Sequence, residues 1–212
     1  MDAEIIVRGE GHARSLPDRA LVRAVVDADG ESRESAYAAA ARPAAAVDEV
    51  VAQRKDVIAN ATTASIVVQP KTRWRKGESV RTGWRAARTT VIEVMTFDGL
   101  GELIAELSAS GAAIAGPIWQ LDPDNEGYRE ARRLAAEDAR RRAEDYAAPL
   151  GLAVTGVKWV AEPGLRAQRA MDYMAGVPMA AAGGAAEDVI DVTPDEIPVH
   201  AAVEVGFALA AT

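Results

Sequence analysis

The sequence contains no cysteine, no long apolar run and no recognisable export signal, and each absence excludes a class of protein. Without thiols the chain has no disulfide framework, thiolate zinc site, iron–sulfur cluster or cysteine nucleophile. No apolar stretch approaches the roughly 20 residues of a membrane-spanning helix. The start, Met-Asp-Ala-Glu, has neither the basic nor the apolar section of a secretory signal. We expect a cytoplasmic chain without a membrane span, or an exported one if a signal has been removed.

The charge balance is acidic, with 24 basic against 32 acidic side chains and a formal net charge of -8. Such a balance argues against a general binder of nucleic acid or anionic membranes, although it allows a local basic patch. Apolar residues make up 49% of the 212 residues, which is enough for a packed core. We expect one domain over residues 1–212, with a long irregular segment at 163–198.

Hydrophobic periodicity predicts an α+β fold in which three helices cover a largely antiparallel sheet. The order is two strands, a helix, two strands, a helix, a strand, a helix and two strands. The predicted strands are Glu4–Arg8, Ala20–Ala28, Thr62–Gln69, Val80–Met95, Ala112–Leu121, Val154–Ala161 and Val199–Leu209. The predicted helices are Glu31–Arg54, Gly99–Ser110 and Asp124–Leu150. The second strand is expected to pair antiparallel with the first or to continue its edge.

Several residues set the expected ends of the elements. Glycines at 9 and 11 end the first strand, Ser32 caps the first helix, and Asp98 caps the second. Pro43 lacks the backbone N–H of a helix interior, so we expect it to kink or split the first helix. In the third helix, one apolar stripe steps by three or four residues and the other face carries opposite charges four residues apart. That stripe is Tyr128, Ala131, Ala135, Ala139, Ala143, Tyr146 and Leu150.

A basic, tryptophan-containing hairpin is the sharpest local feature. Its candidate contact residues are Lys71, Arg73, Trp74, Arg75, Lys76, Arg81, Trp84, Arg85 and Arg88, with Glu78 as the one acid between Lys71 and Arg88. Basic side chains among aromatic rings can bind single-stranded nucleic acid. The alternatives are a solvated hairpin whose arginines stack on its tryptophans, and a contact between copies that involves the acidic segment Glu187–Glu196. We expect the contact between copies.

Other candidate chemistry is sparse. His12, Ser15 and Asp18 lie close in sequence, but nearness in sequence does not make a catalytic triad, and a polar turn explains them. His12 and His200, the only histidines, become neighbours if the first and last strands pair, yet a metal site also needs carboxylates. We expect no catalytic residue, cofactor or metal.

Two further motifs are weaker. The Gly9-x-Gly11 pair lacks the third glycine and the strand-to-helix context of a dinucleotide loop. Met171, Met174 and Met179 with Tyr173 form either an adaptable docking segment or an unstructured one.

The order of motifs resembles the SIMPL-domain family along nearly the whole chain. Its opening resembles Ile5–Gly11 followed by Leu16–Ala20, and its central strand and following helix resemble Thr82–Gly101. Its third helix, with alanine at every fourth residue and a closing Leu-Gly, resembles Tyr128–Leu152, and its closing Thr-Pro segment resembles Ile190–Pro198. This chain departs from the family in lacking the signal peptide that most members carry, and in having Pro43 within the first helix.

The resemblance implies an α+β fold and, for at least one member, a large hollow homo-oligomer; another member is tied to oxidative-stress defence. The family has no established enzymatic activity or catalytic residues. We therefore expect a non-enzymatic protein that self-assembles, with a possible link to stress. Polyanion or nucleic-acid binding through the basic hairpin, residues 71–88, is the alternative.

Overall fold

The computed structural model describes residues 3–75, 77–165 and 192–212. Of Arg75 it describes the backbone alone. The described residues form seven strands and three α-helices, in the order that the hydrophobic pattern predicts. This confirms the α+β fold, but the strands form two antiparallel sheets instead of one. Contacts divide the chain into two compact units, one on each sheet. The single domain stays a prediction.

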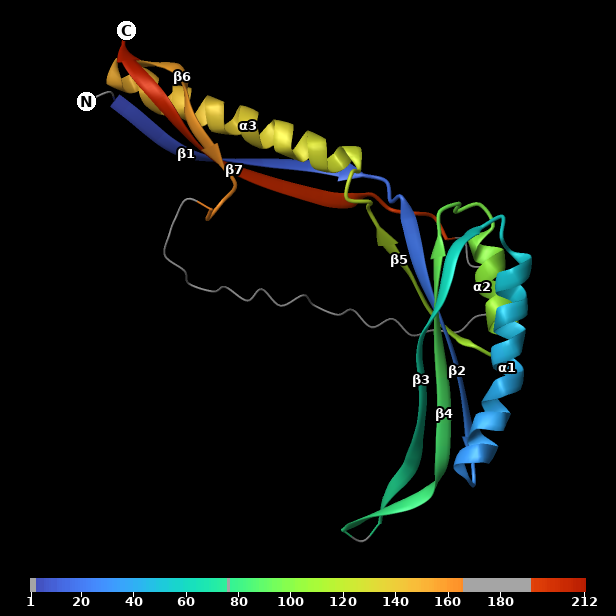
Figure 1. Ribbon diagram of the computed structural model, residues 1–212. Helices are drawn as coiled ribbons and strands as arrows, with labels where there is room; N and C mark the ends of the chain where they lie inside the picture. The colour runs from blue at the N-terminus through green and yellow to red at the C-terminus, as the bar shows by residue number, and fades with distance from the viewer. Residues whose placement is uncertain (1–2, 76, 166–191) are drawn as a thin grey trace. The chain divides into compact units, whose positions relative to one another are not determined.

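The first unit contains a three-stranded sheet in the order β1-β7-β6. Its elements are β1 (Ala3–Ser15), α3 (Glu126–Ala147), a short 3-10 helix (Ala148–Leu150), β6 (Leu152–Ala161) and β7 (Ile197–Ala211). Helix α3 lies along this sheet (Figure 1). Val7, Val205 and Phe207 of the sheet form a buried cluster with Ala139 and Ala143 of the helix.

Glycine allows α3 to approach β1 closely. A Cβ atom at Gly9 would lie 2.1 Å from the carbonyl oxygen of Ala135, and one at Gly11 would lie 2.0 Å from that of Ala131. Real Cβ atoms do not come this close, so only glycine fits unless the helix moves away. The prediction that these glycines end the first strand is wrong, because they lie within β1 at its contact with the helix.

Asp138 of α3 binds the free edge of β1. Its carboxylate accepts a 3.0 Å hydrogen bond from the backbone N–H of Glu10 and is ion-paired with Arg141 and, at 2.7 Å, with Arg142. The backbone hydrogen bond, together with the two arginines, lowers the pKa of Asp138. A buried carboxylate on the helix therefore satisfies a backbone donor that strand pairing leaves open.

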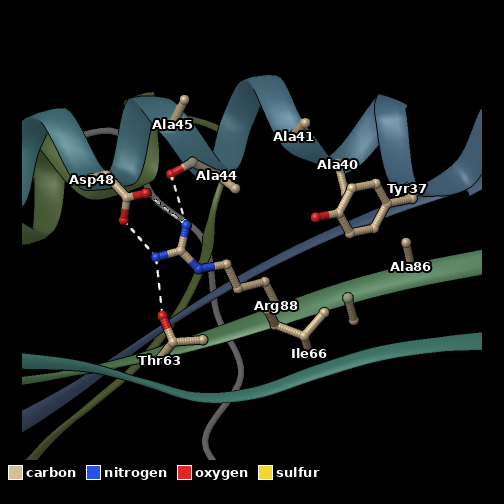
Figure 2. A pocket seen from close by; sticks show the side chains of 11 residues that line it. Tyr37, Ala40, Ala41, Ala44, Ala45, Asp48, Thr63, Ile66, Ala86 and Arg88 are labelled. Carbon is tan, nitrogen blue, oxygen red and sulfur yellow. Dashed lines mark hydrogen bonds and ion pairs between the residues drawn. The ribbon is translucent and has the colours of Figure 1, made fainter.

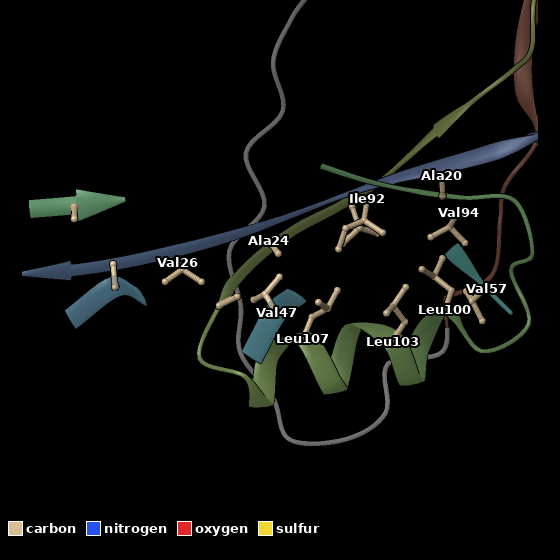
Figure 3. Packing of buried hydrophobic residues seen from close by; sticks show 14 of the residues in the cluster. Ala20, Ala24, Val26, Val47, Val57, Ile92, Val94, Leu100, Leu103 and Leu107 are labelled. Carbon is tan, nitrogen blue, oxygen red and sulfur yellow. The ribbon is translucent and has the colours of Figure 1, made fainter. Parts of the chain in front are cut away.

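The second unit contains a four-stranded sheet in the order β3-β4-β2-β5. Its elements are β2 (Arg19–Gly30), α1 (Arg33–Gln53), β3 (Ile58–Arg75), β4 (Glu78–Val94), α2 (Leu100–Ala109) and β5 (Ala113–Gln120). Leu100, Leu103 and Leu107 of α2 pack with Ile92 and Val94 of β4 in the main core (Figure 3). All five side chains are fully buried.

Strand pairing differs from the prediction. β2 pairs with β4 and β5 in the second unit, whereas β1 pairs with β7, so the expected pairing of the first two strands is wrong. A short connection favours a hairpin, but the last strand of the chain takes the place beside β1 instead. β5, which contains Gly116-Pro117, is an edge strand with a register shift, as expected of a proline within a strand.

The helix ends are partly as predicted. Ser32 caps α1, as expected, and forms a reciprocal capping box with Ser35. Asp98 does not cap α2: Gly99, in the left-handed conformation at φ 86°, takes the N-cap position, and no side chain bonds there. Helix α1 runs through Pro43 as one element, so the helix is not split.

The third helix is confirmed, but its buried stripe ends differently. Ala131, Ala135, Ala139 and Ala143 are buried as expected. Tyr146 and Leu150 are 64% and 71% exposed, because the buried position after Ala143 is four residues on, at Ala147. The expected four-residue ion pairs include Arg133–Glu137, Asp138–Arg142 and Arg140–Glu144.

Within the part of the chain that the structure describes, no helix is long and apolar enough to cross a membrane. Most of the predicted irregular segment 163–198 lies outside the described residues, and so does the methionine cluster Met171, Met174 and Met179 with Tyr173. Residues 163–165 and 192–198 of that segment are described. Among them, Val192 packs against the core of the second unit.

Candidate functional site

The predicted hairpin is confirmed and is longer than expected. β3 and β4 pair from Ile58 opposite Val94 to Arg75 opposite Glu78, and Gly77 closes the turn at φ 85°. Residues 70–79, which join the two predicted strands, are mostly strand as well. β2 ends with Gly30 opposite Trp84, so β4 before Trp84 pairs with β3 alone among the described strands. We call this two-stranded ribbon, residues 71–83, the hairpin arm.

The basic residues of the prediction divide between the hairpin arm and the four-stranded sheet. Lys71, Arg73, Trp74 and Arg81 lie in the arm, whereas Trp84, Arg85 and Arg88 lie where β2 also pairs. Arg75 ends β3 with its side chain undescribed, and Lys76 lies outside the described residues. The seven of the nine residues whose side chains the structure describes therefore do not form one surface.

Acidic side chains of β2 pair with two of the basic residues. Lys71 is ion-paired with Asp29, and Arg85 is ion-paired with Asp27. Asp27 and Asp29 alternate along β2 and so share one face of the sheet. Gly83 lies opposite Lys71 and carries no side chain, which leaves room for the lysine to reach across β4. The alternation of Asp27 and Asp29 was visible in the sequence, but it is informative only once β2 is known to lie beside β4.

Arg88 faces α1 and is tied to it. Its guanidinium donates to both carboxylate oxygens of Asp48, at 2.7 and 2.5 Å, and to the hydroxyl of Thr63 at 3.1 Å. The hydrogen bonds to Asp48 raise the pKa of Arg88. Figure 2 shows this pair at one end of a groove between α1 and the hairpin, and the groove has a volume of about 340 Å³. Ala40, Ala44 and Ile66 contribute to its largely apolar lining.

Trp84 matches the alternative in which arginines stack on the tryptophans of the hairpin. It is half-buried against the main core, and the guanidinium groups of Arg33 and Arg81 lie 4.7 and 5.7 Å from its ring centroid. A neighbouring hollow of about 520 Å³ is lined by two basic residues, Lys71 and Arg73, and two acidic ones, Asp29 and Glu31. These charges balance, so this hollow is not a strongly basic surface.

Trp74 is different, because it is 72% exposed near the tip of the hairpin arm. It lies opposite Ser79, while the next pair joins Arg73 and Val80. Adjacent strand positions point to opposite faces, so Trp74 and Val80 lie on opposite faces of the ribbon. Val80 is also exposed, at 44%. Both faces of the hairpin arm therefore present apolar side chains to solvent.

The two histidines come together in the first unit. His12 of β1 lies directly opposite His200 of β7, and their ring centroids are 4.7 Å apart. Glu10 precedes His12 by two residues on the same face, and the metal-ligating atoms of all three side chains lie within 4.8 Å of one another. All three residues are exposed. The sequence pattern pointed to the two histidines and not to Glu10.

The possible triad of His12, Ser15 and Asp18 is not assembled. His12 and Ser15 lie three residues apart in β1, so their side chains point to opposite faces of the strand. Asp18 accepts a 2.7 Å hydrogen bond from the backbone N–H of Asp122. It bonds a backbone group, as expected of a turn residue, but one that is distant in the sequence.

Comparison with protein families finds a match over nearly the whole chain. The family model SIMPL, described as a protein of unknown function (DUF541), matches residues 5–207. This chain belongs to the SIMPL family. The match confirms the resemblance in the sequence, and it spans residues of both compact units. A search of curated proteins found no match for this SIMPL chain.

Proposed function

We propose that this SIMPL protein is a non-enzymatic, self-assembling protein in which the hairpin arm of one copy packs against a second copy. The observation that carries the proposal is the exposure of Trp74, 72%, on a two-stranded ribbon. A two-stranded ribbon is only marginally stable in water without further packing. Contact with a second copy would cover the arm and stabilise it.

Exposed apolar side chains continue along β3 from the arm toward the sheet. Ile66 is 60% exposed and Val67 is 42% exposed, and both precede the arm on the same strand. Burying a large apolar side chain completely is worth about 1.5–3 kcal/mol. Adjacent strand positions alternate between faces, so Ile66 and Val67 lie on opposite faces of β3. Large exposed apolar side chains on both faces are more typical of a protein contact than of a solvated hairpin.

β3 also offers an open strand edge. It is 18 residues long and is the outermost of the described strands of its sheet, so among these strands one side of its backbone has unpaired N–H and C=O groups. Such an edge can pair with a strand of another chain. The partner we propose is a second copy, because the arm retains the basic Arg73 and Arg81 while the chain as a whole carries a net charge of -8.

Solution mass tests the proposal. Sedimentation of the full chain at micromolar concentration is expected to give a mass above that of one chain. Trp74→Ser is expected to weaken the association about tenfold or more, as for a buried aromatic contact. Met95→Ser, at another exposed apolar residue (57%), is the matched control and is expected to change nothing. A wild-type chain that stays monomeric, or equal effects of the two variants, would refute the proposal.

The alternative is polyanion binding by the same arm. Ion pairs to Asp27, Asp29 and Asp48 already engage three of the basic residues, which supports a protein contact over a phosphate contact. Arg73 adjoins the exposed Trp74, so Arg73→Glu is the variant that distinguishes the two. Tight binding of a single-stranded oligonucleotide at low salt, lost in Arg73→Glu, would favour the alternative.

A further inference from the structure

The cluster of Glu10, His12 and His200, here called the two-histidine cluster, lies on the face of the first sheet that α3 does not cover. α3 packs against Gly9 and Gly11, which alternate with these residues along β1. The two histidines are a directly opposed cross-strand pair, and Glu10 is one step along the same face. Three ligand-bearing side chains from the first and last strands thus converge on one point.

We propose that the two-histidine cluster binds a divalent transition-metal ion with the ligand preference of Zn²⁺. Two imidazoles and one carboxylate are a common zinc ligand set, and a water molecule would complete a tetrahedron. Imidazole nitrogens favour zinc, copper and nickel over magnesium or calcium, which prefer oxygen ligands. No cysteine competes for the ion anywhere in the sequence.

The geometry is close to what the ion needs. Bonds of about 2.0–2.1 Å in a tetrahedron place neighbouring ligand atoms about 3.3 Å apart. The ligand atoms here lie within 4.8 Å of one another, so they must move together by less than 2 Å. Exposed side chains can make that movement by rotating about χ1 and χ2. The strand backbones, held by the pairing of β1 with β7, need not move.

The neighbouring charges do not block the site. Arg8 forms an ion pair with Glu10 at 3.7 Å, and Arg14 lies on the other side of His12 along the same face. An exposed ion pair of this kind is weak, so a metal ion can displace it.

The experiment is a titration of the untagged full chain with zinc chloride, followed by calorimetry. We expect one ion per chain, and we expect His12→Asn and His200→Asn each to weaken binding at least tenfold. Glu10→Gln is expected to weaken it less, because one neutral ligand atom remains. Glu204→Gln, a carboxylate on the same face four residues from His200, is the matched control and should bind zinc as the wild type does.

A second measurement guards against a folding defect in the variants. The wild-type chain has only two histidines, so its imidazole NMR signals are few, and both rings should shift together as zinc is added. Binding that both asparagine variants retain, or zinc that shifts neither ring, would show an adventitious ion only and would overturn the proposal. Absence of binding in the wild type would overturn it as well.

Discussion

The two compact units both pack helices against an antiparallel sheet, but they do so with different side chains. In the second unit the large residues Leu100, Leu103, Leu107 and Ile92 fill the space between α2 and the sheet. In the first unit α3 meets β1 through alanine and glycine, and backbone atoms nearly touch across the interface at Gly11. Large side chains fill the core of the second unit, whereas in the first unit the helix backbone lies close to the strand backbone.

This difference predicts opposite sensitivities. A core filled by large side chains loses stability when atoms are removed, because a cavity is left. An interface closed by glycine loses stability when atoms are added, because the helix has to move away. The units should therefore respond differently to the same kind of substitution, and local hydrogen exchange can assign each response to its unit.

Leu103→Ala should have the largest effect. Leu103 is fully buried in α2, and removing its branched end leaves a cavity among Ile92, Leu100 and Leu107. The free energy of unfolding is expected to fall by about 2–5 kcal/mol. Urea denaturation measures the loss, and hydrogen exchange should locate it in residues 17–122. Met95→Ala, at an exposed position, is the control; a loss of the same size there would contradict the cavity explanation.

Gly11→Ala is the complementary change in the first unit. The new Cβ would lie 2.0 Å from the carbonyl oxygen of Ala131 and 2.5 Å from the backbone nitrogen of Ala135. Backbone atoms cannot rotate aside, so α3 must shift. The free energy of unfolding is expected to fall by about 3 kcal/mol. Gly156→Ala is the control, because a Cβ there meets nothing within 4 Å. Faster hydrogen exchange in α3 and β1 for Gly11→Ala, and not for Gly156→Ala, would support a close approach of α3 to β1.

The same difference explains what the sequence could predict. The elements of the second unit follow from large apolar residues at regular spacing, and the whole order of helices and strands was predicted in this way. The role of Gly9 and Gly11 was not, because glycine in a strand indicates a turn as readily as a close contact. The apolar character of Tyr146 and Leu150 predicts a longer stripe on α3, whereas the helical spacing buries the smaller Ala147.

Which residues meet in the candidate sites depends on the pairing of strands that are far apart in the sequence. The sequence pattern indicates the basic residues of the hairpin. It does not connect them with Asp27 and Asp29, because local spacing does not show which strand pairs with β2. The two-histidine cluster likewise depends on β1 pairing with β7, which brings residues 188 positions apart to one register position. Local patterns therefore identify elements and charged segments, and the sheet register decides which side chains meet.

Asp138→Asn tests the hydrogen bond that holds the edge of β1 to α3. The amide can still accept from the N–H of Glu10, but it loses the charge that Arg141 and Arg142 face. We expect a loss of about 1–2 kcal/mol in the free energy of unfolding, seen in the exchange of the first unit. Asp145→Asn, an exposed acid on the same helix, is the control and should have little effect.

The pH dependence of Asp138 has a definite sign. Its pKa is lowered in the folded chain, so the unfolded chain binds the proton more tightly. The stabilisation is therefore complete above the unfolded aspartate pKa of about 3.9 and is lost as the pH falls through the lower folded value. Denaturation at pH 6 and pH 3 should show a smaller wild-type advantage over Asp138→Asn at pH 3. An equal advantage at both values would exclude this role for the carboxylate.

The helix caps should give the smallest effects, and they compare the two units directly. Ser32 accepts from the N–H of Ser35 at the start of α1, and Asn125 accepts from the N–H of Gly127 at the start of α3. Ser32→Ala and Asn125→Ala should each cost about 1 kcal/mol, because one N–H at the helix start loses its acceptor. Exchange should quicken in α1 for the first variant and in α3 for the second. Each unit is the internal control of the other: if either cap variant loosened both helices equally, the two units would unfold as one, and the different sensitivities of their cores would have to be measured as changes in a single transition.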